Sequence, residues 1–567
     1  MGLLGEFFLG VFPLGCIILR YKQHADLVSM KKPPYEPILF TLLLLLALLP
    51  IWSVTFFVTG DGPCHLYNSK ILLDWYRGEA LDFYKPFYFL NPHLDPNWLT
   101  NLIQIPLLMV FPAPVVEKVF FSMYILLFAG GFRFLCRQIN PDAVFLSALG
   151  ILFAWNHIVM MGFLNNALSL ALWFWVLGYW WKVRAFGNVF ELLSLALLFF
   201  ALYLAHPIGL FFTGLSIMSM LLGQFFYQQQ QSNWKAALKT MLWQGGKVLL
   251  LSLPGLVFFA QFILKREWRP ETGPSWINIL DNLVRLTALI NLSRAENAVA
   301  AAVSIFCILL FGLAIRLRWR ERRWLESDGL LIFVVVSFGV ILFPPSGLMG
   351  GLEVPLRMVM IPFIALLLWM ATVKFPTWAK QTCMGFGLLA TLVFLWVRLP
   401  IHWEASNYAE EVYSLRYQIP DQSRMLVLNY DWDGHTPEGK IIADKIWLFN
   451  HLDCYLGAQS SLVISDNYEA NFWYFPTVAH WETNMYTQTD KDGINFDHRP
   501  PRADILSYQR RTQGQEIDYV LLLSPKPEYA QHPYTLEIME QLNQIYTKVS
   551  TTEHGRAVLY KKVKSEK

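Results

Sequence analysis

Asp61 and His65 are the residues whose types and spacing could most directly do chemistry in this sequence. They lie in the stretch GDGPCH, residues 60–65, just after the first long apolar segment. A carboxylate can take a proton from a hydroxyl or an amine, and an imidazole four residues away can share or relay that proton. Two alternatives stay open: Asp61 caps a helix that begins near Pro63, and His65 is an ordinary helix-surface residue at an interface.

Membrane helices are the elements that must position these two residues. Of the 567 residues, 55% are hydrophobic and only 15% are charged, whereas soluble domains carry roughly 25% charged residues. Because a span needs about 20 apolar residues, the sequence predicts about eleven spans, at 36–58, 115–136, 143–161, 163–181, 189–206, 207–227, 243–265, 296–316, 329–344, 355–373 and 381–399. Residues 3–19 are apolar but short and interrupted, so both an interfacial helix and a twelfth span remain open.

Lysine and arginine residues in the short connections indicate the orientation, since such residues favour the cytoplasmic side. They collect on the side of Lys31 and Lys32, while the connections near residues 162 and 206 carry none. This places Asp61, the loop 59–114 and the tail on the outer side. The net charge of +3, without a basic run of interleaved aromatics, does not indicate a nucleic-acid partner.

Two segments are expected outside the membrane. The loop 59–114 contains a short amphipathic helix at 65–77 and an apolar stretch at 97–111 that we interpret as an interfacial helix. The tail 401–567 is polar and predicts a small α/β domain, with strands at 424–430, 461–465, 517–523 and 557–560 and helices at 440–457 and 534–547. The chain is therefore divided into an N-terminal interfacial or extra membrane segment (1–35), a transmembrane domain (36–400) and this tail.

Two details of the outer parts have more than one interpretation. Residues 466–474 are dense in polar and aromatic side chains, which suits carbohydrate binding and an interdomain contact equally. Cys64 and Cys454 are the two cysteines expected on the outer side. A disulfide between them is one interpretation, and two unrelated thiols is the preferred one.

This layout resembles the GT-C superfold of polytopic membrane glycosyltransferases, a group that includes aminoarabinose transferases, protein O-mannosyltransferases and oligosaccharyltransferases. The resemblance lies in the acidic residue directly after the first span, here Asp61, the long outer loop with two interfacial helices, the short-looped spans and the outer domain. It implies a sugar donor linked to polyprenyl phosphate, and a loop carboxylate that acts as general base or metal ligand.

One departure from that group affects the metal. Many of its members carry a second acidic residue where the third span ends, but residues 155–166 contain none here. We therefore expect Asp61, alone or with His65, to act on protons. No metal ligands are assigned, although a divalent metal stays an open option.

Support for the departing phosphate is expected from Arg357, just inside the outer end of an apolar span. A cation at that depth needs a partner or a polar cavity, so it is a functional hypothesis by default. The alternatives are snorkelling to the interface, or a salt bridge with Glu353 one helical turn away.

Further candidates for substrate binding also lie at outer span ends. They are His206 at a tight junction of two spans, Asn165 and Asn166 near the start of a span, and Arg266 and Arg269 at a membrane edge. The asparagines could bind sugar hydroxyls. The alternatives are a capped turn for the histidine, helix-packing amides for the asparagines, and helix anchors for the arginines.

The sequence thus predicts a polytopic α-helical membrane glycosyltransferase that works at the outer face of a bacterial inner membrane, with a periplasmic C-terminal domain. Its expected partners are a polyprenyl-phosphate sugar donor, a glycan, lipid or protein acceptor, and membrane lipid. The alternative is a non-enzymatic transporter or assembly factor for lipid-linked or cell-surface polysaccharide. The span interiors are nearly free of charged residues, which favours surface chemistry over a transmembrane path.

Overall fold

The structure is a computed structural model that describes residues 35–185, 187–231, 233–265, 276–321, 324–342, 357–490 and 498–563. The candidate residues Arg266 and Arg269 lie outside the described residues, and so does Glu353. Of the N-terminal segment 1–35, only residue 35 is described. The chain divides into two compact units, Met1–Leu42 and Leu43–Lys567. Residues 35–42 are the described part of the first unit, and all other described residues belong to the second.

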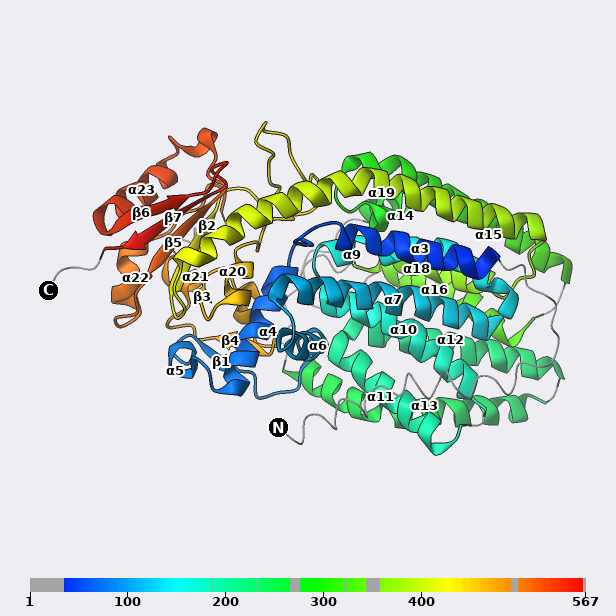
Figure 1. Cartoon of the computed structure of the whole chain (residues 1–567). Helices are drawn as coiled ribbons and strands as arrows, with labels where there is room; N and C mark the ends of the chain where they lie inside the picture. Colours follow the sequence, from blue (N-terminus) through cyan, green and yellow to red (C-terminus); the bar gives the residue numbers. More distant parts are fainter. Residues whose placement is uncertain are drawn as a thin grey trace. The chain divides into compact units, whose positions relative to one another are not determined.

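The chain is a polytopic helical membrane protein (Figure 1). Among the described residues, seven helical segments are long and apolar enough to cross a membrane: Tyr35–Trp52 (α3), Ala113–Ile139 (α7), Pro141–Met160, Pro207–Gln231 (α12), Trp234–Leu264 (α13), Arg294–Glu321 (η5 and α15) and Thr377–Gln418 (α19 and η7). The other predicted spans coincide with α10 (Leu164–Val183), α11 (Val189–Ala205), α16 (Gly329–Leu342) and α18 (Met360–Met370).

The segment predicted as one span at 143–161 is broken rather than continuous. It consists of η2 (Pro141–Leu146), α8 (Ser147–Gly150), η3 (Ile151–Ala154) and α9 (His157–Met160). The break falls at Asn156, whose backbone is extended and whose side-chain oxygen accepts a hydrogen bond from Val159 N at 3.1 Å. Asparagine competes with the helix for backbone partners in this way, so the segment ends one helix and caps the next.

The loop after the first span contains the two predicted helices. They are α4 (Gly62–Arg77) and α6 (Leu99–Leu108), separated by the short α5 (Leu81–Tyr84) and by β1 (Tyr88–Leu90). Strand β1 pairs antiparallel with β4 (Thr477–Ala479). The loop and the tail therefore share a small sheet, although nearly 400 residues separate them in the sequence.

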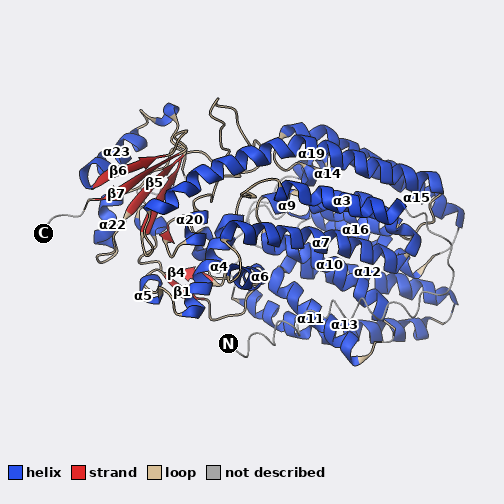
Figure 2. Ribbon diagram, in the orientation of Figure 1, coloured by secondary structure: helices blue, strands red, loops and turns tan. Residues whose placement is uncertain are grey.

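The tail contains a five-stranded mixed sheet in the order β3-β2-β5-β7-β6. Strands are drawn red in Figure 2. Its strands are β2 (Arg424–Asn429), β3 (Val463–Ile464), β5 (Tyr519–Leu523), β6 (Tyr546–Thr551) and β7 (Ala557–Lys562), accompanied by α20 (Cys454–Gln459), α22 (Ile505–Arg511) and α23 (Pro533–Ile545). Strand β2 runs parallel to β3 and β5, and β7 is antiparallel to β5 and β6. Helix α19 (Thr377–Tyr413) passes through residue 400 without interruption.

The helix predicted over 440–457 is wrong for most of its length. Helix α20 begins only at Cys454, and the preceding residues form turns. The N–H groups of Asp444 and Phe449 donate to Leu292 O and Trp432 O, at 3.1 and 3.0 Å, rather than along a helix. Distant backbone partners have here overridden the local periodicity.

Candidate active site

Asp61 is held in place by close backbone pairing between two loops. Gly60 N donates to Met160 O at 3.0 Å, and Asp61 N donates to Met161 O at 2.9 Å. A Cβ on Gly60 would lie 2.6 Å from Met161 O, and one on Gly162, whose φ is +83°, would lie 2.4 Å from Asp61 N. Gly162 must be glycine because of its positive φ and the close approach, and Gly60 because of the close approach alone. The two glycines therefore lock the Asp61 loop onto residues 160–162, just before α10.

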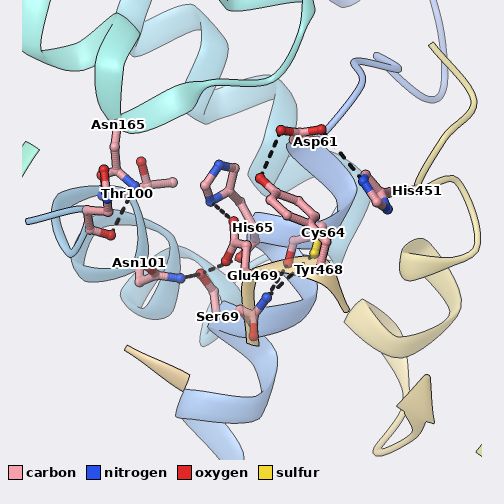
Figure 3. Close-up of polar contacts among 12 residues, drawn as sticks. Asp61, Cys64, His65, Ser69, Thr100, Asn101, Asn165, His451, Tyr468 and Glu469 are labelled. Carbon is pink, nitrogen blue, oxygen red and sulfur yellow. Dashed lines mark hydrogen bonds and ion pairs between the residues drawn. The ribbon is translucent and has the colours of Figure 1, made fainter. Parts of the chain in front are cut away.

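The Asp61 side chain faces the tail and does not cap its helix. Asp61 occupies the N-cap position of α4, but its side chain makes no capping hydrogen bond. Instead, Oδ2 accepts a hydrogen bond from the Tyr468 hydroxyl at 2.8 Å, and Oδ1 lies 3.7 Å from His451 Nε2 (Figure 3). Only 8% of Asp61 is exposed. The carboxylate is thus buried between two polar groups that arrive from the tail.

His451 is itself held by a second carboxylate. Its Nδ1 lies 3.0 Å from Asp466 Oδ2, and its ring stacks on the Tyr468 ring with centroids 4.7 Å apart. The Asn450 amide lies 2.8 Å from Nε2 and helps to fix the plane of the ring. This arrangement of carboxylate, imidazole and carboxylate orients the ring towards Asp61.

His65, the second predicted catalytic residue, pairs with a carboxylate that local sequence patterns do not place beside it. Its Nδ1 forms an ion pair with Glu469, which is fully buried (Figure 3). It also makes a backbone hydrogen bond with Gly162. The imidazole is therefore fixed against the tail and against the start of α10, on the same side of α4 as Asp61.

The charges in this cluster shift one another's pKa values. Burial raises the pKa of Asp61, while His451, the Tyr468 hydrogen bond, His65 and Arg357 each act to lower it, and the net direction is upward. Burial alone would lower the pKa of both histidines. The Glu469 carboxylate raises the pKa of His65 above its usual value, and Asp466 raises the pKa of His451 well above it. A buried carboxylate with a raised pKa beside two histidines is typical of an acid–base site.

Arg357 lies near the same site. Its guanidinium stacks on the Phe163 ring, 3.9 Å from the ring centroid, and its charge acts on both Asp61 and His206. His206 ends α11, and its Nδ1 accepts a hydrogen bond from Ile208 N at 3.2 Å. The charge of Arg357 thus reaches both Asp61 and His206, and the histidine also caps the turn into α12.

The two asparagines have different surroundings. Asn165 Oδ1 accepts from Thr100 N at 2.9 Å, and its amide nitrogen donates to Asn97 O at 3.0 Å. These bonds occupy the amide and hold the start of α6 against α10. Asn166 is only 1% exposed, and within the described part of the chain neither end of its amide has a hydrogen-bond partner. A buried amide without partners is unusual and is a feature expected of a ligand or water site.

Several residues of the site escaped prediction from the sequence. Tyr468 and Glu469 belong to residues 466–474, whose many polar and aromatic side chains suggested a binding role or an interdomain contact. The sequence did not indicate that they lie beside Asp61 and His65. His451 gave no local signal. Glu117, buried in α7, accepts a hydrogen bond from Tyr455. A carboxylate near the start of an apolar span was the available signal for it.

The described residues do not present a metal-binding set. No group of three or more His, Cys, Asp or Glu side chains among them is arranged to hold a metal ion. Both oxygens of Asp61 face protein partners.

No protein-family model matches the chain, and no curated protein matches it. Similar solved structures include ArnT from Cupriavidus metallidurans bound to undecaprenyl phosphate, with 12% identity over 93% of this chain and 98% of that chain and a TM-score of 0.45. Another is the archaeal oligosaccharyltransferase AglB from Archaeoglobus fulgidus in complex with an inhibitory peptide and a dolichol-phosphate. It is 10% identical over 94% of this chain and 75% of that chain, with a TM-score of 0.45. A third is the arabinofuranosyltransferase AftD from Mycobacteria, which is 14% identical over 93% of this chain and 41% of that chain, with a TM-score of 0.47.

Proposed function

We propose that the chain is a GT-C-type glycosyltransferase that moves a sugar from a polyprenyl-phosphate-linked donor to a glycan, lipid or protein acceptor, with Asp61 as its general base. The observation that carries the proposal is the buried Asp61 carboxylate, oriented by Tyr468 and His451 and close to the charge of Arg357. A base must be oriented and tuned towards the working pH: the contacts orient Asp61, and its burial raises its pKa.

The proposed reaction is a single displacement at the sugar. Asp61 takes the proton of the acceptor hydroxyl or amine, and the acceptor atom bonds to C1 of the sugar. The bond between C1 and the phosphate oxygen breaks, and its electron pair leaves with the polyprenyl phosphate. Arg357 stabilises the phosphate as its negative charge grows. We assign Oδ1 to the acceptor proton, because its 3.7 Å contact with His451 is looser than the hydrogen bond on Oδ2.

Roles for the remaining candidates follow from their surroundings. His65, held by Glu469, is proposed to steady the Asp61 charge and to share its proton. The unsatisfied amide of Asn166 is proposed to bind a sugar hydroxyl. Asn165 and His206 are proposed to position the site through their backbone contacts.

The site is proposed to face the periplasm of a bacterium, with residues 36–400 in the inner membrane and 401–567 outside it. Helix α10 starts beside the Asp61 loop, and its far end carries Lys182 and Arg184. There, Arg184 pairs with Glu326 at 2.7 Å and Lys182 with Glu191 at 3.7 Å. Positive residues at the end away from Asp61 support placing that end in the cytoplasm.

Donor consumption tests the enzyme against the transporter alternative. Membranes that contain the chain would be supplied with a panel of undecaprenyl-phosphate-linked sugars, and the release of undecaprenyl phosphate would be measured. Asp61→Asn should lower release by about 10²-fold or more, the usual contribution of a general base. Asp82→Asn is the matched control, because its exposed carboxylate lies on α5 of the same loop. Wild-type release by Asp61→Asn would refute the proposal.

Donor binding separates the role of Arg357 from that of Asp61. Arg357→Ala should weaken the binding of undecaprenyl phosphate in detergent micelles, whereas Asp61→Asn should leave that binding nearly unchanged. Arg357→Lys should recover part of the affinity, because a point charge supports phosphate without the bidentate geometry. Equal affinity in the wild type and in Arg357→Ala would remove this residue from the mechanism.

A further inference from the structure

Two thiols from distant parts of the chain meet beside the candidate active site. Cys64 lies in the first turn of α4 and Cys454 begins α20, and both are fully buried. Each thiol influences the pKa of the other, which indicates that the two side chains lie close together. Each also touches one of two consecutive residues: Cys64 Sγ lies 3.5 Å from Asn467 Oδ1, and Cys454 Sγ lies 3.7 Å from Asp466 O. Both cysteines are free thiols in the structure, so the choice between a disulfide and two unrelated thiols stays a prediction.

The two helices hold these cysteines in matching positions. Helix α20 packs directly on α4. Tyr67 lies three residues after Cys64, and Gly457 lies three residues after Cys454. These two residues are in close contact, because a Cβ on Gly457 would lie 2.5 Å from the Tyr67 ring. Tyr67 also donates a hydrogen bond to Leu462 O at 2.6 Å. Helix α20 thus packs tightly on α4 one turn beyond the cysteines, and a disulfide requires the two elements that carry it to lie close together.

The other described cysteines differ in their setting. Cys136, Cys307 and Cys383 lie within the apolar helices α7, α15 and α19. Among the described residues, Cys64 and Cys454 are the two that lie outside apolar helices, in the parts proposed to face an oxidising compartment. Disulfides form and persist in such compartments.

We propose that Cys64 and Cys454 are joined by a disulfide bond that ties the Asp61 loop to the tail. The bond would form by exchange with a protein disulfide oxidant of the outer compartment. The two thiols lose two protons and two electrons, and the disulfide of the oxidant is reduced to two thiols. This inference rests on the outer placement in the proposed function, and does not depend on the sugar-transfer chemistry.

The timing of the bond follows from burial. Burial raises the pKa of both thiols, so neither supplies much thiolate once the tail has packed on α4. The exchange therefore takes place while the tail folds onto the loop, and the finished bond is shielded from reductants. His451 lies three residues before Cys454, and Tyr468 follows the two residues that contact the thiols. The bond would hold both against Asp61.

Peptide mass spectrometry of the full chain tests the proposal directly. Membranes from expressing cells are quenched in acid, denatured, blocked with N-ethylmaleimide and digested without reductant. A linked pair of peptides containing Cys64 and Cys454 is expected, and it should disappear after dithiothreitol. The Cys136→Ser variant should retain the linked pair, and Cys64→Ser should lose it. N-ethylmaleimide on both cysteines of the unreduced wild type would overturn the proposal.

Thermal unfolding provides a second readout. Dithiothreitol should lower the unfolding temperature of the wild type, and leave that of Cys64→Ser/Cys454→Ser unchanged. An alkaline phosphatase fused to the C-terminus reports separately which side the tail occupies. Active phosphatase with blocked thiols overturns the disulfide alone. Inactive phosphatase overturns the outer placement and the disulfide with it, whereas the Asp61→Asn assay still tests the transfer chemistry.

Discussion

Replacing Gly162 with alanine should disrupt the candidate active site without touching any of its ionisable groups. Gly162 has a φ of +83°, and a Cβ there would lie 2.4 Å from Asp61 N and 2.5 Å from Gly62 N. Both obstacles are backbone atoms at the start of α4, so they cannot move aside like the end of a flexible side chain. The alanine must push the two loops apart.

The size of the effect follows from two contributions. A left-handed conformation costs a non-glycine residue about 1–2 kcal/mol, and overpacking of a tight contact costs about 1–3 kcal/mol. Gly162→Ala should therefore lose about 2–5 kcal/mol of stability. Separation of the loops also breaks the bonds from Gly60 N and Asp61 N to the 160–161 backbone. Because a misplacement of about 1 Å can cost about 10²-fold in rate, donor consumption should fall to a similar extent.

Thermal unfolding in detergent micelles and donor consumption in membranes measure the two effects. Gly385→Ala is the matched control, because Gly385 lies in α19 and a Cβ there meets nothing within 4 Å. Alanine is favoured over glycine within a helix by roughly 0.5–1 kcal/mol, so this control should be neutral or slightly stabilising. If Gly162→Ala unfolds at the same temperature as Gly385→Ala and consumes donor at the wild-type rate, the described locking of the two loops is refuted.

Two further predictions concern stability. Arg398 is 4% exposed and binds the fully buried Glu296 at 2.8 Å, so Arg398→Met should leave an unpaired buried charge and cost about 3–5 kcal/mol. Thermal unfolding should show a large loss that Arg285→Met, in an exposed pair with Asp281, does not. Equal unfolding temperatures would contradict this prediction. His451 and His65 have raised pKa values when folded, so they bind protons more tightly in the folded state. Their contribution to the free energy of unfolding is complete below the unfolded-state pKa of about 6.5, and it is lost as the pH rises through the folded-state pKa. The unfolding temperature should therefore fall between neutral and alkaline pH, and fall less in His451→Gln; an equally steep fall in that variant would refute the assignment.

Local patterns in the sequence determined the membrane architecture. Helices coincide with most of the predicted spans among the described residues, the segment 143–161 being broken into short pieces, and α4 and α6 occupy the two helical stretches predicted in the first loop. The runs at 424–430 and 517–523 became β2 and β5. These predictions succeed because a span, an amphipathic helix and a buried strand are each specified by the composition and periodicity of a short segment.

The acidic residue after the first span was equally visible, because Asp61 and its glycines are neighbours in the sequence. Its surroundings were not. His451, Tyr468 and Glu469 reach Asp61 and His65 only because the tail folds back onto α4. No periodicity within the tail encodes that return. A one-dimensional pattern records which face of an element is buried and leaves open which other element covers it.

The sequence by itself thus determined that the chain is a membrane protein of many helices with an acidic residue at the head of a long loop. Only the tertiary structure decided that Asp61 is oriented by Tyr468 and His451, and that Cys64 meets Cys454. The physical reason is the range of the interactions involved. Hydrophobic periodicity acts over one or two turns of chain, whereas a buried carboxylate must find hydrogen-bond partners wherever the packed fold brings them.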